Sequence, residues 1–177
     1  GPFDVVFAAT RSHLQDLNHI APALAQALRE RPALRLTTFL NAHAPRCLRL
    51  PNAIHLPWME WSRYRAFVAE NRFHAAIAPA LDTHFNRARS ISKVHDHAAF
   101  GAAGIYSHQP PFDHIVTHDT SGLPISKDPE HWRVTLHDLV ERRDKTLNIA
   151  GGGQALSRSL GDMLRVRNFW VTELGVE

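Results

Sequence analysis

The chain has 177 residues, of which 44% are hydrophobic, and its formal net charge at neutral pH is +3. This length suits one domain, residues 1–177, and Lys and Arg are interspersed with Asp and Glu, so the composition does not favour a nucleic-acid-binding protein. The lone Cys47 excludes an internal disulfide, and no apolar run approaches the roughly 20 residues of a membrane span, so we expect a cytoplasmic protein.

The first half of the chain alternates strand and helix patterns. Residues 3–10 are rich in β-branched and aromatic side chains, which indicates a buried first strand. Apolar residues then recur every three or four positions over 14–30, which predicts an amphipathic helix. Ser12 would cap this helix, with Gln15 completing a capping box. Two strands and a helix should follow, at 34–40, 53–56 and 58–71.

The second half is organised around residues 78–101. The unbroken apolar run 75–80 is typical of a parallel strand covered on both faces, and a polar loop and a helix capped by Ser90 should follow it. Asp128 precedes Pro129, an arrangement that predicts the start of a later helix. Two strands and a short helical segment are expected between these helices, at 104–107, 123–126 and 110–116.

The alternation of strands and helices predicts the fold class. It indicates an α/β, Rossmann-like three-layer parallel sheet with helices on both faces and right-handed crossovers. The run Gly151 to Gly153 has no preceding strand and no following Lys-Ser/Thr, so we interpret it as a turn and not as a phosphate-binding loop.

A stripe of charged residues marks the central helix. Arg89, Lys93, Asp96 and His97 recur at spacings of three and four. A lysine there can neutralise a phosphate, and a carboxylate can accept hydrogen bonds from ribose hydroxyls. Spacing alone favours the simpler interpretation, an exposed ion pair between Lys93 and Asp96 worth about 0.2–0.5 kcal/mol.

A longer pattern surrounds this stripe. Upstream it includes residues 11–17 and the His55-Leu56-Pro57 segment, and its other positions are Phe85, Asn86, Arg89, Ser90, Lys93, Asp96, His97, Ala99, Gly101, Pro111, Phe112, Gly122, Leu123 and Trp132. In this order they resemble the nucleotide-sugar-binding half of retaining glycosyltransferases of family 4 and their group 1 relatives. The resemblance covers nearly the whole chain.

The resemblance implies a fold, a reaction class and partners. It implies the C-terminal half of a two-domain GT-B glycosyltransferase that transfers a sugar from an NDP-sugar to a glycan or lipid-linked acceptor, as in polysaccharide or O-antigen synthesis. The acceptor-binding domain would lie outside this chain, so the chain alone should not catalyse transfer. We expect no metal cofactor, and we keep peripheral membrane association of the full protein open.

The resemblance also implies roles for individual residues. Lys93 and Arg11 would be catalytic, facing the donor diphosphate, with Asp96 at the ribose. The other donor-binding residues would lie at the sugar-phosphate region, beside the phosphate or at the base: Asp82, Thr83, Phe85, Asn86, Ser90, His13, His55 and Leu56.

Three positions depart from the family pattern. Asp96 stands in place of a glutamate, His97 in place of a tyrosine, and Ala88 in place of the first glutamate of a Glu-x7-Glu pair. The altered Glu-x7-Glu pair and Asp96 motivate an alternative: a non-catalytic Rossmann-like binding or assembly module that has lost the donor site.

Other chemistries receive less support. His95 with His97, or His114 with His118, could supply zinc ligands, but neither pair has a third ligand at a recognisable spacing. There is no Gly-x-Ser-x-Gly elbow and no Gly-x-Gly-x-x-Gly after the first strand. We interpret the stripe of Trp58, Trp61 and Tyr64 as core packing, with a sugar-stacking platform as the alternative.

Overall fold

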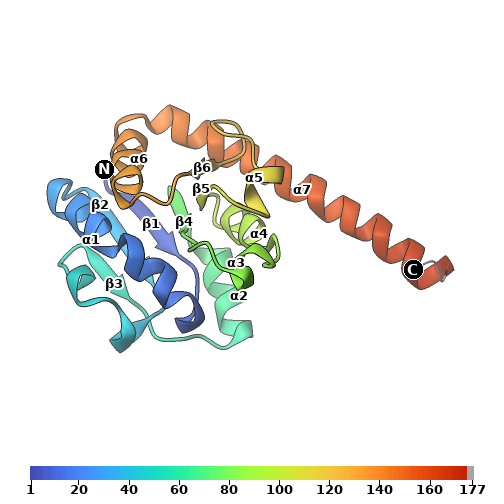
Figure 1. Cartoon of the computed structure of the whole chain (residues 1–177), viewed down its shortest axis with the longest axis horizontal. Helices are drawn as coiled ribbons and strands as arrows, with labels where there is room; N and C mark the ends of the chain where they lie inside the picture. The colour runs from blue at the N-terminus through green and yellow to red at the C-terminus, as the bar shows by residue number, and fades with distance from the viewer. Residues whose placement is uncertain (175–177) are drawn as a thin grey trace.

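A six-stranded parallel sheet forms the centre of the protein, in the order β3-β2-β1-β4-β5-β6 (Figure 1). The computed structural model describes the backbone of residues 1–174 and the side chains of residues 1–161. The strands are β1 (Phe3–Phe7), β2 (Leu34–Thr38), β3 (Ala53–His55), β4 (Ala75–Ala78), β5 (Ala103–Ser107) and β6 (Leu123–Ile125). All the predicted strands form, and most end earlier than predicted because their last residues turn out of the sheet.

Helices cover both faces of this sheet, which confirms the predicted three-layer α/β class. The helices are α1 (Leu14–Glu30), α2 (Trp61–Glu70), α3 (His84–Arg87), α4 (Ser92–Ala99), α5 (Phe112–Ile115), α6 (Pro129–Glu141) and α7 (Arg143–Leu174), with 3-10 turns η1 (Arg11–His13), η2 (Asn41–His43) and η3 (Arg46–Leu48). Among the described residues, no helix combines the length and apolarity that crossing a bilayer requires.

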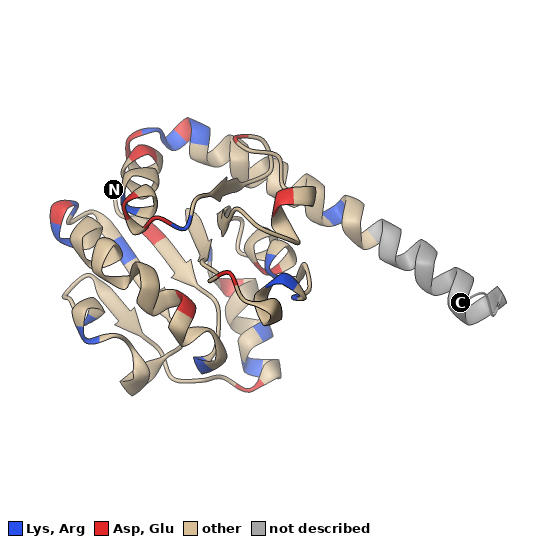
Figure 2. Cartoon of the chain, in the orientation of Figure 1, with Lys and Arg blue, Asp and Glu red and all other residues tan. Residues whose placement is uncertain are grey.

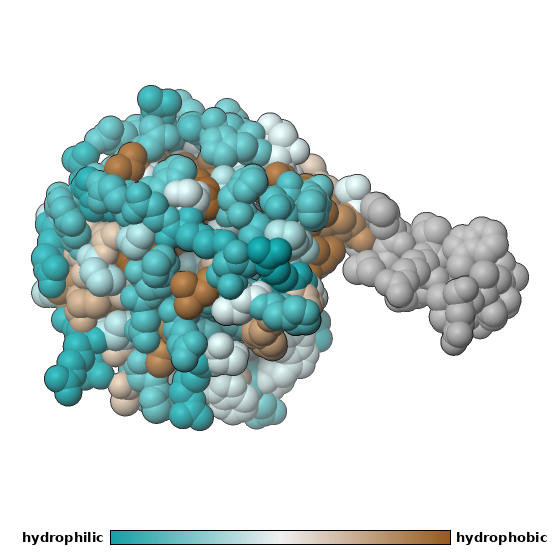
Figure 3. All heavy atoms as spheres, viewed as in Figure 1, coloured by the Kyte–Doolittle hydropathy of each residue, from teal (hydrophilic) through white to brown (hydrophobic). Residues whose placement is uncertain are grey.

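The strand β1 illustrates how the two faces are buried. Phe3, Val5 and Phe7 belong to the cluster that α1 and α6 cover, whereas Val6 and Ala8 pack with the aromatic residues of α2. This alternation follows from the two-residue period of a strand. The surface carries interspersed acidic and basic residues (Figure 2), and its visible face is largely hydrophilic (Figure 3).

The helix caps differ from the prediction at two of three positions. The N-cap of α1 is His13 and not Ser12, because η1 precedes the helix and the Ser12 hydroxyl bonds to Thr10 at 2.8 Å. Ser90 is not the N-cap of α4, which begins after Ile91, although Ser90 Oγ accepts a bond from the Ser92 N–H at 3.3 Å. Asp128 caps α6 as predicted, through the Glu130 N–H at 3.0 Å.

The predicted turn at Gly151 to Gly153 is wrong, because these glycines lie inside α7. At Gly152 the helix passes directly over the loop that precedes β6. A Cβ on Gly152 would lie 1.8 Å from the Thr120 carbonyl oxygen. The missing side chain of Gly152 thus allows two backbone segments to approach closely. The residues next to Gly152 in the sequence cannot reveal this contact.

Candidate functional site

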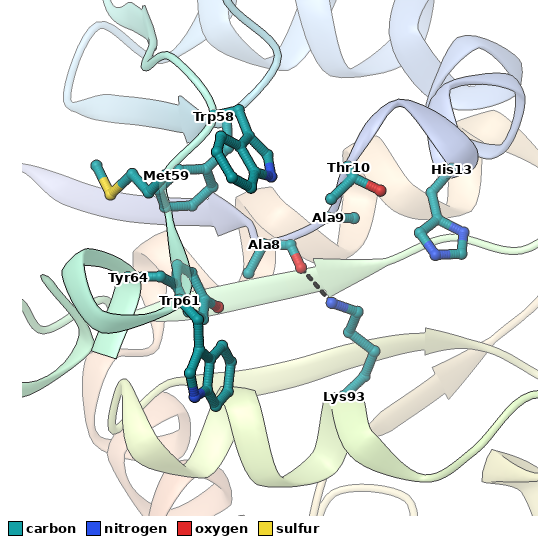
Figure 4. Close-up of a pocket in the computed structure, with 10 residues that line it drawn as sticks. Ala8, Ala9, Thr10, His13, Trp58, Met59, Trp61, Tyr64 and Lys93 are labelled. Atoms are coloured by element: carbon teal, nitrogen blue, oxygen red, sulfur yellow. Dashed lines mark hydrogen bonds between the residues drawn. The ribbon is translucent and has the colours of Figure 1, made fainter. Parts of the chain in front are cut away.

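A cavity lies at the carboxyl end of β1, where the strand order reverses between β1 and β4. Ligands of open α/β sheets commonly bind in this crevice, because the loops leaving the two strands separate there. The cavity has a volume of about 300 Å³ (Figure 4). It is lined by Ala8, Ala9, Thr10, His13, Phe39, Trp58, Met59, Trp61, Tyr64 and Lys93.

One side of the cavity is an aromatic wall, formed by Trp58, Trp61 and Tyr64, with Met59 beside them (Figure 4). Trp58 is 71% exposed and Trp61 is 68% exposed, so the predicted core packing is wrong for both tryptophans. Tyr64 is half-buried, with its ring centroid 6.1 Å from Trp61 and 5.6 Å from Phe39. The tryptophans are exposed because they lie in the loop after β3 and the first turn of α2, beyond the strand ends.

The opposite side of the cavity carries Lys93, from α4, together with His13 and Thr10 (Figure 4). The Lys93 ammonium donates to the Ala8 carbonyl oxygen and, at 3.2 Å, to Asp96 Oδ2. The predicted ion pair between Lys93 and Asp96 is therefore present, but it is partly buried and not exposed as predicted. With only 15% of its side chain exposed, Lys93 is held at the end of β1, and the cavity offers a positive charge facing aromatic rings.

Arg11 lies in a second, adjoining cavity of about 770 Å³. The two cavities share Thr10, Phe39 and Trp58 in their linings. An Arg11 guanidinium nitrogen lies 3.3 Å from His43 Nε2. Lys93 and Arg11 therefore both lie at the carboxyl edge of the sheet. Lys93 lines the first cavity and Arg11 lines the second.

A cluster that the sequence analysis missed lies beneath this edge. Asp16, in the first turn of α1, is only 5% exposed. Its Oδ1 accepts hydrogen bonds from the Leu81 N–H and from Asn86 Nδ2, each at 2.8 Å. Arg89 lies 3.8 Å from the other carboxylate oxygen. We call this group the polar tie, because it joins α1 to the loop after β4.

The polar tie keeps its carboxylate ionised. Burial alone would raise the pKa of Asp16, but the His13 imidazole 3.5 Å from its Oδ2, the hydrogen bonds from the Leu81 N–H and Asn86, and the charge of Arg89 together lower that pKa below its usual value. Arg89 also lies 3.2 Å from His13 Nε2, so His13 connects the polar tie to the cavity. The only feature of the sequence that could have indicated the polar tie is an acidic residue in the first turn of the helix after β1.

The predicted donor loop lies beside this cluster, outside the lining of the 300 Å³ cavity. Asn86 is buried and uses its amide for Asp16 and the Leu81 carbonyl. Thr83 caps α3 by accepting the Asn86 N–H at 3.1 Å. Phe85 is 64% exposed. Asp82 is held by Arg87 at 2.6 Å, and this hydrogen bond lowers the pKa of Asp82 to about 2.

The polar groups of the predicted base-contacting segment are already paired within the protein. His55 Nδ1 lies 2.7 Å from the Thr38 hydroxyl, and its Nε2 lies 2.9 Å from the Leu48 carbonyl oxygen. The Leu56 N–H donates to the Thr38 carbonyl oxygen at 2.8 Å, and the Leu56 carbonyl accepts from the Asn41 N–H at 3.1 Å. These four atoms fix the end of β3.

The two α4 histidines that were candidate zinc ligands contact hydroxyl groups of the protein instead. His95 Nδ1 lies 2.7 Å from the Ser157 hydroxyl, whereas His97 is buried with its Nδ1 3.1 Å from the Tyr106 hydroxyl. Burial, aided by the nearby Lys93 charge, lowers the pKa of His97 to about 3. Within the part of the chain that the structure describes, no three His, Cys, Asp or Glu side chains gather as a metal site would require.

Comparison with solved structures identifies the fold. The C-terminal domain of the glycosyl transferase group 1 family protein LpcC from Francisella tularensis superposes with a TM-score of 0.69 at 11% identity, covering 89% of this chain and 85% of that domain. HepE of Anabaena, solved in complex with UDP-glucose, gives a TM-score of 0.68 at 12% identity, covering 94% of this chain and 49% of HepE.

A third structure shows that this fold serves more than one named activity. A putative UDP-N-acetylglucosamine 2-epimerase from Listeria monocytogenes superposes with a TM-score of 0.61 at 8% identity, covering 100% of this chain and 46% of that protein. The chain thus spans about half the length of HepE and of this protein. No family model matches the sequence, and no curated protein resembles it significantly. The likeness establishes the fold alone, which this chain shares with the C-terminal domain of LpcC and with part of HepE and of the Listeria protein.

Proposed function

We propose that the chain, which has the fold of a group 1 glycosyltransferase C-terminal domain, binds the nucleotide-sugar donor of a glycosyltransferase. One observation carries the proposal. A lysine faces an aromatic wall across a cavity at the carboxyl edge of the sheet, and this pairing suits a ligand that joins anionic phosphates to a ring. HepE, whose fold is similar, was solved with UDP-glucose.

The diphosphate would be bound by charge. Lys93 supplies a cation at the end of β1, and the turn η1 that leads into α1 lies at the positive end of the helix dipole. Phosphate oxygens would replace the Ala8 carbonyl as the acceptor for the Lys93 ammonium. In the transfer reaction, Lys93 and Arg11 would stabilise the charge that develops on the departing diphosphate.

The remaining predicted residues would act around this centre. Asp96, once the Lys93 ammonium moves to the phosphate, would be free to accept hydrogen bonds from the ribose hydroxyls. Ser90 would offer a neutral hydrogen bond, and His13, which lines the cavity, would lie near the phosphate. Asn86 would act by positioning the 82–86 loop, since its amide is committed to the polar tie. We propose that no metal is required, and that an acceptor-binding domain outside this chain completes the enzyme.

A non-catalytic binding or assembly module is the second candidate. The observation that favours it is the occupation of Lys93, whose ammonium is already satisfied by the Ala8 carbonyl and Asp96. Under this proposal the ion pair is structural, and Ala88 and Asp96 mark the loss of the donor site. Nucleotide binding that weakens in Asp96→Ala would argue against it.

Titration calorimetry with UDP and GDP tests the donor-binding proposal. We expect saturable binding of at least one nucleotide. Lys93→Ala should bind at least tenfold more weakly, because the variant loses the partly buried ammonium that faces the phosphates. Lys145→Ala is the matched control, since Lys145 is paired with Asp119 and Asp138 away from the cavity. Absence of saturation up to millimolar nucleotide, or equal binding by Lys93→Ala, would overturn the proposal.

A further inference from the structure

We infer that the nucleobase is held by stacking on Trp58 and Trp61, with few hydrogen bonds to its edge, and that the site therefore discriminates weakly between bases. This inference rests on the proposed donor-binding function and adds the manner in which the base is recognised.

The first observation is the exposure of the two indoles. They line one cavity, face Lys93 across it, and remain 71% and 68% exposed. Tryptophan is highly buried on average in folded proteins, so two such side chains on one wall indicate a surface for a ligand. Every base has a π-face, and stacking on an aromatic side chain is accordingly tolerant of base identity.

The second observation concerns the polar groups that could read a base edge. Beside the tryptophans, the ring nitrogens of His55 and the N–H and carbonyl of Leu56 are all engaged by Thr38, Leu48 and Asn41. Among side-chain atoms, the aromatic wall offers two indole N–H groups, which can only donate, and the Tyr64 hydroxyl, with the Met59 thioether as a weak acceptor beside them. A base entering the cavity therefore meets ring faces first and few side-chain acceptors for its own donors.

The third observation is the position of the charge. Lys93 lies across the cavity from the tryptophans (Figure 4). A nucleoside diphosphate could place its base on the aromatic wall while its phosphates reach the ammonium and the start of α1. A site discriminates strongly between bases when its own polar groups pair with the right base and are left unpaired by the wrong one. The side chains of the aromatic wall supply few such groups.

Titrations with UDP, GDP and inorganic pyrophosphate, a probe without a base, test the inference. We expect UDP and GDP to bind within about tenfold of each other, because stacking dominates. Trp58→Ala and Trp61→Ala should each weaken both nucleotides roughly tenfold and leave pyrophosphate unchanged. Trp58→Phe should retain most of the affinity, since it keeps an aromatic face.

Leu147→Ala is the control for these variants, because Leu147 is also exposed, at 66%, but lies away from the cavity. Circular dichroism of each variant confirms folding. A preference above about a hundredfold for one base, or wild-type UDP affinity in both Trp→Ala variants, would overturn the inference while Lys93-dependent binding left the proposed function standing. Failure of the wild-type chain to bind any of the three probes would instead remove the proposed function, and the inference with it.

Discussion

Two clusters at the carboxyl edge of the sheet differ in whether their side chains are satisfied by the protein itself. In the polar tie, Asp16 and Asn86 are buried, and their hydrogen bonds go to each other and to the loop after β4. In the aromatic wall, Trp58 and Trp61 are exposed. Polar residues beside a site can therefore serve to hold the fold together, whereas aromatic residues whose spacing is typical of a core can form an exposed surface.

The largest effect should come from the polar tie. In Asp16→Ala the Leu81 N–H and the Asn86 amide lose a buried acceptor, and Arg89 loses an opposite charge 3.8 Å away, so we expect the free energy of unfolding to fall by about 3 kcal/mol. Chemical denaturation measures this loss. Asp82→Ala is the matched control at the same edge, because Asp82 is exposed and its ion pair with Arg87 is screened by solvent, so its midpoint should move much less. Equal midpoints for Asp16→Ala and wild type would show that the tie is not structural.

A second effect should appear with pH at His97, which is also closed to solvent. The unfolded chain takes up a proton on this residue near pH 6.5, but the folded chain does so only near the lowered pKa of about 3. The unfolded state therefore binds more protons between these values, and folding stability must fall as the pH is lowered through this window.

The expected slope from this one group is up to about 1.4 kcal/mol per pH unit. Denaturation of wild type and His97→Gln between pH 6.5 and 4 measures it, and the variant should lose less stability on acidification. Parallel pH profiles of the two proteins would contradict the burial of a neutral His97.

The smallest effect on stability should come from the aromatic wall. Trp58→Ala removes an exposed side chain, so we expect the free energy of unfolding to change by less than about 0.5 kcal/mol. Thermal or chemical denaturation checks this value. A large loss of stability in Trp58→Ala would show that the indole belongs to the core after all, and would erase the contrast with the polar tie.

Much of the fold was predictable from local patterns. The 14–30 helix, the all-parallel strands and the Asp128 cap follow from periodicity and from residue preferences that act within a few positions. The caps at Ser12 and Ser90 failed because short non-α turns precede both helices. Gly152 failed because its requirement for glycine comes from Thr120, across the fold.

The candidate site was predictable only in part. Sequence order indicated Lys93 and its partner Asp96, which the structure pairs. It could not indicate that Asp16 lies against Asn86, because 70 residues separate them in the chain. Nor could it show that Trp58 and Trp61 are exposed, since an aromatic stripe at helical spacing is equally expected of a core-facing helix.

A crystal structure of the chain with UDP would test the central claim most directly. The account predicts the diphosphate within hydrogen-bond distance of the Lys93 ammonium, near the first turn of α1, with the uracil ring on the face of Trp58 or Trp61. Density for UDP elsewhere on the molecule, with Lys93 still bonded to the Ala8 carbonyl and the tryptophans uncovered, would contradict it.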